Sequence, residues 1–485
     1  MRSAKKIAVI DIGSNSCRMV IYEQAGGALI PYFNEKAMAG LGRDLAETGR
    51  LSPAGKELAL QTFHRFRAIT ASLKISNIRA VATAAVREAI DGDDFKKAAE
   101  KILGVSIQVL TGADEGRLSA GGVRTGFIEP KGLVADLGGT SMELLPLEDD
   151  TLGETFLLGP LARSKDVDLP LDKRAKAIRK ILSNSDLFSE HQGGKLYAVG
   201  GAWRNVAAVH MMLRNYPLRV AHGYTMTRRD VQNVIDAADL AASDKLTREQ
   251  LQSVSKRRYD TLLHAAILLD TLMEQLGTDK SVISSFGLRD GVAAEGLKSD
   301  GASGLLEAVP LFLRSSQESV VFGRELFSFI FPISDQFKQS EAVLRAVCLM
   351  ADAGARMHPD HRANLVYEQV LRAPVPALSH AQRLFAAYAA ASRYTFKFVE
   401  EPGYAGMLKL SHKRRAKILG CAMRLAGVYS GRSGPILATA RLKVADGALC
   451  MHVDRNYSDL ISDTVERRLG QLSGLMKLHP RLIVE

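Results

Sequence analysis

One short motif occurs twice in the chain and limits the folds that the chain can adopt. Asp11-Ile-Gly-Ser-Asn-Ser16 follows the apolar run Ile7–Ile10, and Asp136-Leu-Gly-Gly-Thr-Ser141 follows the apolar run Gly132–Ala135. Corresponding positions of the two copies are 125 residues apart. In both copies a strand-like segment ends in aspartate and opens a glycine turn. Because the repeat is as long as a domain, it predicts a duplicated α/β domain and not a solenoid of short repeats.

The order of predicted elements around each motif is also the same. Strand-like segments joined by tight turns come first, and helices then alternate with further strands, over 7–122 and again over 132–291. A glycine- and serine-containing linker follows at 298–304, and the apolar spacing beyond it becomes helical. We therefore expect three domains, the last mostly α-helical, at 1–125, 126–300 and 301–485.

The formal net charge is +11 and the isoelectric point about 9.4, so the chain should attract anions. Nucleic acid, anionic lipid and polyphosphate all fit this charge. The chain has no apolar stretch of membrane-spanning length, and its basic N-terminus runs directly into a strand-like segment. We expect a cytoplasmic protein that has no membrane association. None of the four cysteines has a metal-binding spacing.

The residue types in the two glycine turns suit the binding of phosphate. Glycine lets a ligand approach the backbone closely, and successive N–H groups in a turn bind anions. The aspartates Asp11 and Asp136 would repel a bare phosphate, so they make sense beside phosphate only with a divalent cation between them. Two such turns facing each other would hold one phosphate and its metal. The candidate phosphate-binding residues of the turns are Gly13, Ser14, Asn15, Ser16, Gly138, Gly139, Thr140 and Ser141.

Three further side chains are candidates for the same site. Glu115 lies at a strand-to-helix junction, where a carboxylate can also simply stabilise the helix N-terminus, as we expect for Asp114. Glu143 shares a strand face with Ser141, because side chains alternate along a strand. Arg87 follows a strand directly and could bind phosphate through its guanidinium group, or it could be an ordinary surface arginine.

The motifs together resemble those of the exopolyphosphatase / guanosine pentaphosphate phosphohydrolase family. The resemblance rests on the order and spacing of Asp11–Ser16, Ala82-Thr-Ala-Ala-Val-Arg87, Gly112-Ala-Asp-Glu115-Gly-Arg-Leu118 and Asp136-Leu-Gly-Gly-Thr-Ser-Met-Glu143. Leu288-Arg-Asp-Gly291 resembles a further family motif. The likeness covers residues 5 to about 296 well and the remainder loosely.

The resemblance implies a ribonuclease H / actin-like fold with an active site between two domains. It implies magnesium-dependent hydrolysis of the terminal phosphoanhydride of inorganic polyphosphate or of guanosine pentaphosphate. It makes Glu115 the general base that positions water, and Arg87 and the glycine turns the phosphate-binding groups. It makes Asp136 and Glu143 metal ligands, to which the chemistry of the first turn adds Asp11.

Several positions depart from the family pattern. Thr140 stands where the family has a third glycine, and Met142 stands where it has threonine, so we expect any difference from the family to lie in phosphate geometry and substrate preference more than in the reaction class. The C-terminal region resembles an HD-like domain, and Leu349-Met-Ala-Asp-Ala-Gly354 matches its metal-binding motif with Ala351 in place of histidine. We therefore expect no catalytic metal in that domain.

Four hypotheses remain open. The first two are an exopolyphosphatase and a guanosine pentaphosphate phosphohydrolase, with inorganic polyphosphate or guanosine penta- and tetraphosphate as the partner. The third is an actin-like kinase or ATPase. The fourth is a non-catalytic regulator that binds polyphosphate or nucleotide. We expect no nucleic-acid partner, and a homodimer is compatible with the helical C-terminal domain.

Overall fold

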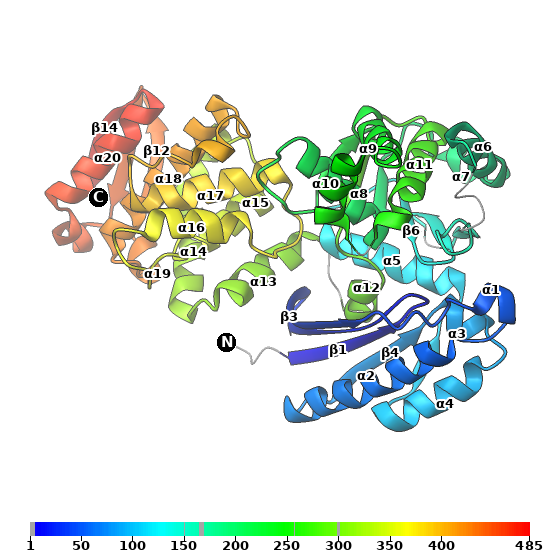
Figure 1. Ribbon diagram of the computed structural model, residues 1–485. Coiled ribbons are helices and arrows are strands. Elements are labelled where there is room, and N and C mark those ends of the chain that lie inside the picture. Colours follow the sequence, from blue (N-terminus) through cyan, green and yellow to red (C-terminus); the bar gives the residue numbers. More distant parts are fainter. Residues whose placement is uncertain (1–4, 150, 164–168, 257, 298–300) are drawn as a thin grey trace. The chain divides into compact units, whose positions relative to one another are not determined.

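The computed structural model describes residues 5–485 except 150, 164–168, 257 and 298–300 (Figure 1). The described chain divides into two compact units, 5–301 and 302–485. The first unit contains both copies of the glycine-turn motif, and the second contains the helical region. In the described part of the chain, none of the helices is both long and apolar enough to cross a membrane.

The first copy of the motif lies in a five-stranded sheet of order β3-β2-β1-β4-β5. The first three strands form an antiparallel meander, whereas β1, β4 and β5 are parallel. Phe63, Phe66 and Phe95 pack against one face of this sheet. The strands are β1 (Lys5–Ile12), β2 (Cys17–Ala25), β3 (Ala28–Ala37), β4 (Asn77–Ala82) and β5 (Ile107–Val109), and the helices are α1 (Leu45–Thr48), α2 (Pro53–Ser72), α3 (Ala84–Glu88) and α4 (Gly92–Leu103).

The second copy lies in a six-stranded sheet of order β10-β11-β9-β6-β7-β8. Without the edge strand β10, this sheet has the same order and the same strand directions as the first, so the predicted duplication of an α/β core is confirmed. The strands are β6 (Leu133–Leu137), β7 (Met142–Pro146), β8 (Glu154–Phe156), β9 (Leu196–Val199), β10 (Thr225–Thr227) and β11 (Lys280–Ser284).

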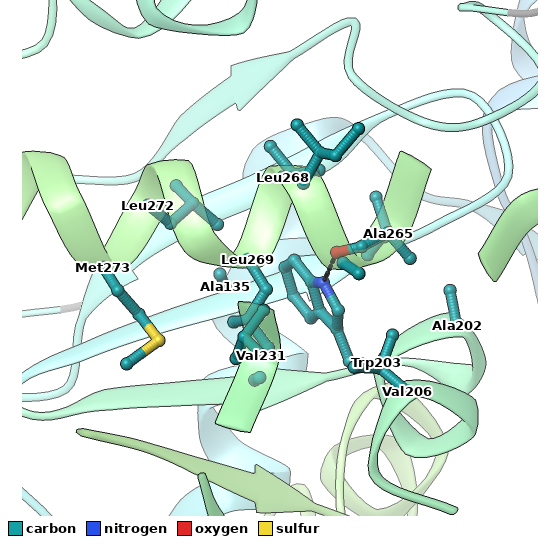
Figure 2. Close-up of a cluster of buried hydrophobic side chains, with 14 of the residues drawn as sticks. Ala135, Ala202, Trp203, Val206, Val231, Ala265, Leu268, Leu269, Leu272 and Met273 are labelled. Atoms are coloured by element: carbon teal, nitrogen blue, oxygen red, sulfur yellow. Dashed lines mark hydrogen bonds between the residues drawn. The ribbon is translucent and has the colours of Figure 1, made fainter. Parts of the chain in front are cut away.

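The helices of the second copy enclose a buried tryptophan. Trp203 is fully buried on α8, and its indole Nε1 donates a hydrogen bond to the backbone oxygen of Ala265 on α11, 2.9 Å away (Figure 2). This bond satisfies a polar group that would otherwise be costly to bury. The helices are α6 (Leu171–Leu182), α7 (Leu187–Glu190), α8 (Gly201–Leu213), α9 (Arg228–Leu240), α10 (Lys245–Ser255) and α11 (Tyr259–Gln275).

Two helices connect the sheets by crossing each other at very short range. Helix α5 (Gly112–Gly126) follows the first sheet in the sequence, but its Ala120 and Val123 pack in the core of the second sheet. Helix α12 (Leu288–Ala294) follows the second sheet in the sequence and packs in the core of the first sheet. A Cβ atom on Gly291 of α12 would lie 1.8 Å from the Leu118 backbone oxygen of α5, so glycine is required there. This crossing fixes the two copies of the motif relative to each other.

The C-terminal unit is mostly helical, as predicted, but it also contains an unpredicted three-stranded sheet of order β12-β13-β14. Asp446 and Gly447 both have positive φ and join β12 to β13, which is a typical hairpin turn. The α-helices are α13 (Gly301–Leu313), α14 (Gln317–Ile330), α15 (Glu341–Leu349), α16 (Arg362–Leu371), α17 (His380–Tyr394), α18 (Leu410–Ser430), α19 (Gly434–Leu437) and α20 (Asp463–Met476). The short 3-10 helices are η2 (Phe331–Gln336), η3 (Pro402–Tyr404) and η4 (Arg455–Leu460). The strands are β12 (Ala440–Ala445), β13 (Ala448–Val453) and β14 (His479–Val484).

Candidate active site

The two glycine turns have the same internal geometry. The Gly13 amide donates a hydrogen bond to the Ser16 backbone oxygen over 3.1 Å, and the Gly138 amide donates to the Ser141 backbone oxygen over 2.9 Å. Each turn joins the first strand of its sheet to the second, so the aspartate that ends the first strand has a fixed neighbour on the second. The duplicated sequence therefore folds into duplicated turns.

The turns face each other across a cavity of about 360 Å³. A Cβ atom on Gly139 would lie only 3.4 Å from the Ser14 Cβ, which places the two turns in direct contact. The cavity brings together all the predicted site residues except Arg87, and these are Asp11, Gly13, Ser14, Asn15, Ser16, Glu115, Asp136, Gly138, Gly139, Thr140, Ser141 and Glu143.

Four carboxylates line this cavity and repel one another. Burial raises the pKa of Glu115 to about 7, Arg87 opposes this rise, and the negative charges of Asp136 and Asp11 add to it. Burial also raises the pKa of Asp136, and burial together with Glu115 and Asp136 raises the pKa of Glu143 well above its usual range. Such crowding of acids in one cavity is a common feature of catalytic sites.

The three carboxylates of the cavity other than Glu115 each have a polar partner. The Ser141 hydroxyl donates to Glu143 Oε1 over 2.6 Å, and the Ser119 hydroxyl donates to Asp136 Oδ2. Asp11 forms an ion pair with Arg289, whose Nη1 lies 2.6 Å from Asp11 Oδ2. The contacts hold these carboxylates in fixed orientations, which is what catalysis by positioned groups requires.

Arg87 acts on the cavity through Glu115. Its Nη1 donates to Glu115 Oε1 over 2.7 Å and to the Leu110 backbone oxygen over 2.5 Å. Its guanidinium group is therefore engaged by a carboxylate, and Arg87 is absent from the cavity lining although we predicted that it binds phosphate there. Next to Glu115, Asp114 forms a capping box with Thr111, which is the helix-stabilising contact that we expected of it.

Five basic side chains also line the cavity, namely Arg18, Lys36, Arg204, Arg258 and Arg289, and sequence reasoning identified none of them as site residues. Lys36 lies across β2–β3 from Arg18, and burial together with Arg258, Arg18, Arg289 and Arg204 lowers the pKa of Lys36 to about 8. Burial and the same neighbouring cations lower the pKa of Arg204 to about 10. Positive charges packed so closely are favourable only near an anion, so this wall suits a multiply charged anionic ligand.

Some sequence signals could have identified these cations. Arg18 lies near the start of β2, only two residues after Ser16 of the first glycine turn. Arg289 occupies the Leu288–Gly291 motif, and Arg258 lies in a basic run. Lys36 and Arg204 had no such signal, because only the fold brings β3 and α8 to the cavity.

The departures from the family pattern have structural explanations. Among the described residues, those with positive φ do not include Thr140, so its turn does not need a third glycine. Met142 is fully buried in the core of the second sheet, where an apolar side chain fits. Neither substitution disturbs the turn that carries the Gly138–Ser141 hydrogen bond.

The carboxylates also suit a hard divalent cation such as magnesium, which prefers oxygen ligands. Magnesium is usually held by one or two carboxylates together with substrate phosphates. The described residues contain no group of three or more His, Cys, Asp or Glu side chains that could hold a metal ion by themselves, so substrate or water would have to complete its ligands. Asp136, Glu143 and Asp11 line the cavity and could contribute oxygen ligands, and a bound cation there would neutralise phosphate charge.

Comparison with known sequences identifies the family. Residues 20–300 match the Ppx/GppA phosphatase family, and residues 316–483 match the domain "exopolyphosphatase, C-terminal". The chain belongs to the Ppx/GppA phosphatase family. It is similar to the guanosine-5'-triphosphate,3'-diphosphate pyrophosphatases of Aeromonas salmonicida, with 28% identity over 305 residues, and Aeromonas hydrophila, with 26% identity over 298 residues. Each match covers 60% of this chain and 59% of the relative's length.

Solved structures show the same fold for the first unit. The Aquifex aeolicus PPX-GPPA enzyme superposes with a TM-score of 0.52 at 23% identity and covers 60% of this chain and 99% of its own. An exopolyphosphatase from Cytophaga hutchinsonii superposes with a TM-score of 0.55 at 20% identity and covers 61% of this chain and 99% of its own. These likenesses agree with the predicted duplicated α/β fold.

Proposed function

We propose that this protein is an exopolyphosphatase, which hydrolyses the terminal phosphoanhydride bond of inorganic polyphosphate and releases orthophosphate. The observation that carries the proposal is that Glu115, the two glycine turns and five cations line one cavity. Phosphoryl transfer needs an oriented nucleophile, neutralised phosphate charge and little else from the protein. The cavity supplies each of these from residues of both sheets.

In this proposal Glu115 orients the attacking water and accepts its proton. The Arg87 guanidinium holds Oε1 of that carboxylate, so Arg87 positions the base. The backbone amides and hydroxyls of the two turns bind the terminal phosphate. The wall of Arg18, Lys36 and the other arginines stabilises the negative charge that leaves with the remaining chain.

Magnesium is the proposed cofactor, held by Asp11, Asp136 and Glu143 together with the substrate. When bound, it would supply positive charge to the phosphate oxygens. A cytoplasmic location and a possible homodimer remain part of the proposal. The proposed domain boundaries at 125 and 300 also remain predictions.

The composition of the cavity lining supports polyphosphate over a guanosine nucleotide as the proposed substrate. Among the described residues that line the cavity, none is aromatic, whereas nucleobases are commonly recognised by stacking on aromatic rings. The second candidate is nevertheless a guanosine pentaphosphate phosphohydrolase, because the two curated relatives carry that type of name. Its triphosphate would use the same turns and cations.

The test is phosphate release from long-chain polyphosphate, guanosine pentaphosphate and ATP, compared by kcat/KM with magnesium present. We expect the highest value for polyphosphate. Glu115→Gln should lower kcat by about 10²–10⁴-fold, because it removes the general base and keeps the side-chain shape. Glu57→Gln makes the same change on an exposed face of α2 and should have no effect. Tight binding without turnover, unchanged in Glu115→Gln, would instead support a non-catalytic regulator.

A further inference from the structure

The C-terminal unit contains a second cavity, which the proposed hydrolysis does not use. Its volume is about 680 Å³, compared with about 360 Å³ for the cavity between the glycine turns. Residues at the beginning of α14, in the turn after α15 and at the junction between α18 and α19 line it. The polar residues that matter for its chemistry are Ser319, Asp352, Arg356 and Arg432.

Asp352 is the buried acid of this cavity, and its charge is already compensated. Arg393 donates from Nη1 and Nη2 to Asp352 Oδ1 over 3.0 and 2.9 Å, and the Ser319 hydroxyl donates to Oδ2 over 3.1 Å. The side chains of Arg393 and Asp352 are only 7% and 9% exposed. A guanidinium group and a hydroxyl therefore occupy the oxygens of the aspartate in the HD-like motif, which leaves the other cations of the cavity available.

Two guanidinium groups remain to attract a ligand. Among the described residues, none forms a hydrogen bond or ion pair with the side chain of Arg356. Arg432 is half exposed and lies at the 4.0 Å limit of an ion pair with Asp352 Oδ2. Arg432 also lines an adjoining hollow of about 220 Å³ together with Arg393 and Arg424.

Positive charge exceeds negative charge over the two hollows. Their arginines are Arg356, Arg393, Arg424 and Arg432, whereas their acids are Asp352 and the exposed Glu318. A cavity of several hundred Å³ with an excess of guanidinium groups matches the size and charge of a small phosphorylated molecule.

The backbone at Arg432 gives an independent reason to assign a use to its side chain. Gly431 and Arg432 both have left-handed backbone conformations, with φ of 59° and 70°. Glycine adopts this conformation freely, whereas a residue with a Cβ atom is strained there. Glycine would therefore suit the fold better at this position, and what arginine adds is a guanidinium group at the wall between the two hollows.

We propose that the cavity of the C-terminal unit binds a phosphorylated small molecule through Arg356 and Arg432, as a site separate from the hydrolytic cavity. The shared chemistry is a phosphate or phosphoanhydride group, which could belong to inorganic phosphate, a short phosphate chain or a nucleotide. Bidentate contacts from arginine to phosphate oxygens would provide the affinity.

Isothermal titration calorimetry on the full chain tests this proposal. The parent protein carries Glu115→Gln, so that ligand is not hydrolysed, and orthophosphate, tripolyphosphate and GTP are titrated separately. The test protein also carries Arg356→Gln and Arg432→Gly. The glycine relieves the left-handed strain, so this protein should fold at least as well as the parent, which a thermal melt checks. The control carries Arg324→Gln instead, which removes one positive charge from an exposed position of α14.

We expect at least one probe to show a class of sites that weakens about tenfold or more in the Arg356→Gln, Arg432→Gly protein and stays unchanged in the Arg324→Gln control. That factor corresponds to the loss of one charge-assisted hydrogen bond. The probe that responds identifies the source of the phosphate group. Titrations of all three probes that are the same in parent and test protein would overturn the proposal, and so would equal weakening in the control. Neither result bears on hydrolysis at Glu115.

Discussion

Replacing Arg87 with methionine removes the guanidinium group from Glu115 and keeps a side chain of similar length. In the native protein Arg87 Nη1 lies 2.7 Å from Glu115 Oε1, and the pKa of Glu115 is about 7. An opposite charge at this distance lowers a carboxyl pKa by about 1–3 units, so its loss should raise the pKa of Glu115 by at least about one unit. The ionised fraction of the base at pH 7 would then fall from about a half to about a tenth, and turnover at pH 7 should fall at least about fivefold.

The assay is kcat/KM for polyphosphate between pH 5.5 and 9.5 at a fixed, saturating magnesium concentration. A general base is active when ionised, so activity rises with pH through its pKa, and Arg87→Met should move this rise to higher pH. The ratio of variant to native activity at the same pH should return toward one at the alkaline end, because both proteins carry Lys36 and lose its charge alike. Arg117→Met is the matched control, because Arg117 lies on α5, the helix of Glu115, but pairs with Asp114 and Glu295 at the surface.

The alternative for Arg87 is the phosphate-binding role predicted from the sequence. In that case Arg87→Met would raise KM at every pH and leave the acidic limb of the profile where it is in the native protein. That result would refute the inference that Arg87 works by positioning and ionising Glu115.

Two other predictions concern the cavity wall and the helix crossing. Lys36 has a pKa of about 8 and is charged below that pH, so kcat/KM for polyphosphate should fall as pH rises through about 8. Lys36→Arg should move that fall to higher pH. An alkaline fall at the same pH in Lys36→Arg would show that Lys36 does not contact substrate. Gly291→Ala would put a Cβ atom 1.8 Å from the Leu118 backbone oxygen and should lower the free energy of unfolding, measured by urea denaturation, by about 1–3 kcal/mol. The control is Gly121→Ala, whose Cβ atom would lie 3.8 Å from its nearest neighbour and should not destabilise the protein. Equal stability of the two variants would mean that α5 and α12 can separate at no cost.

The fold of the first unit could be predicted because its signals are local and repeated. The strand that ends at Asp11 and the strand that ends at Asp136 each precede a glycine turn, and both turns are visible in the sequence. The sheet β12-β13-β14 was not predicted, because the surrounding residues have helical spacing and β14 is separated from β13 by the helix α20. Asp446-Gly447 was a hairpin signal for β12 and β13, but nothing local indicated the parallel pairing with β14.

The site residues that could be predicted from the sequence are those that lie within or next to a motif. Ser14 and Gly139 belong to turns, so their approach across the cavity followed from the duplication. The partner of Arg87 could not be predicted, because its contact with Glu115 depends on how α3 and α5 pack. Lys36 and Arg204 were missed for the same reason, since cavity walls are built from elements that are distant in the sequence.

The duplication also explains why the cavity has two chemically different sides. Asp11 pairs across its strands with Arg18, and at the matching position of the second sheet Asp136 pairs with Glu143. The two sheets therefore have equivalent positions opposite the motif aspartate, and this position holds a cation in the first sheet and a carboxylate in the second. Hydrolysis of a phosphoanhydride needs this asymmetry, because the phosphate chain requires positive charge whereas water and a metal ion require carboxylates. In the proposed mechanism, this difference of one residue at matched positions would orient the substrate between the two turns, with its remaining chain toward Arg18 and its reacting phosphate toward Glu115 and Glu143.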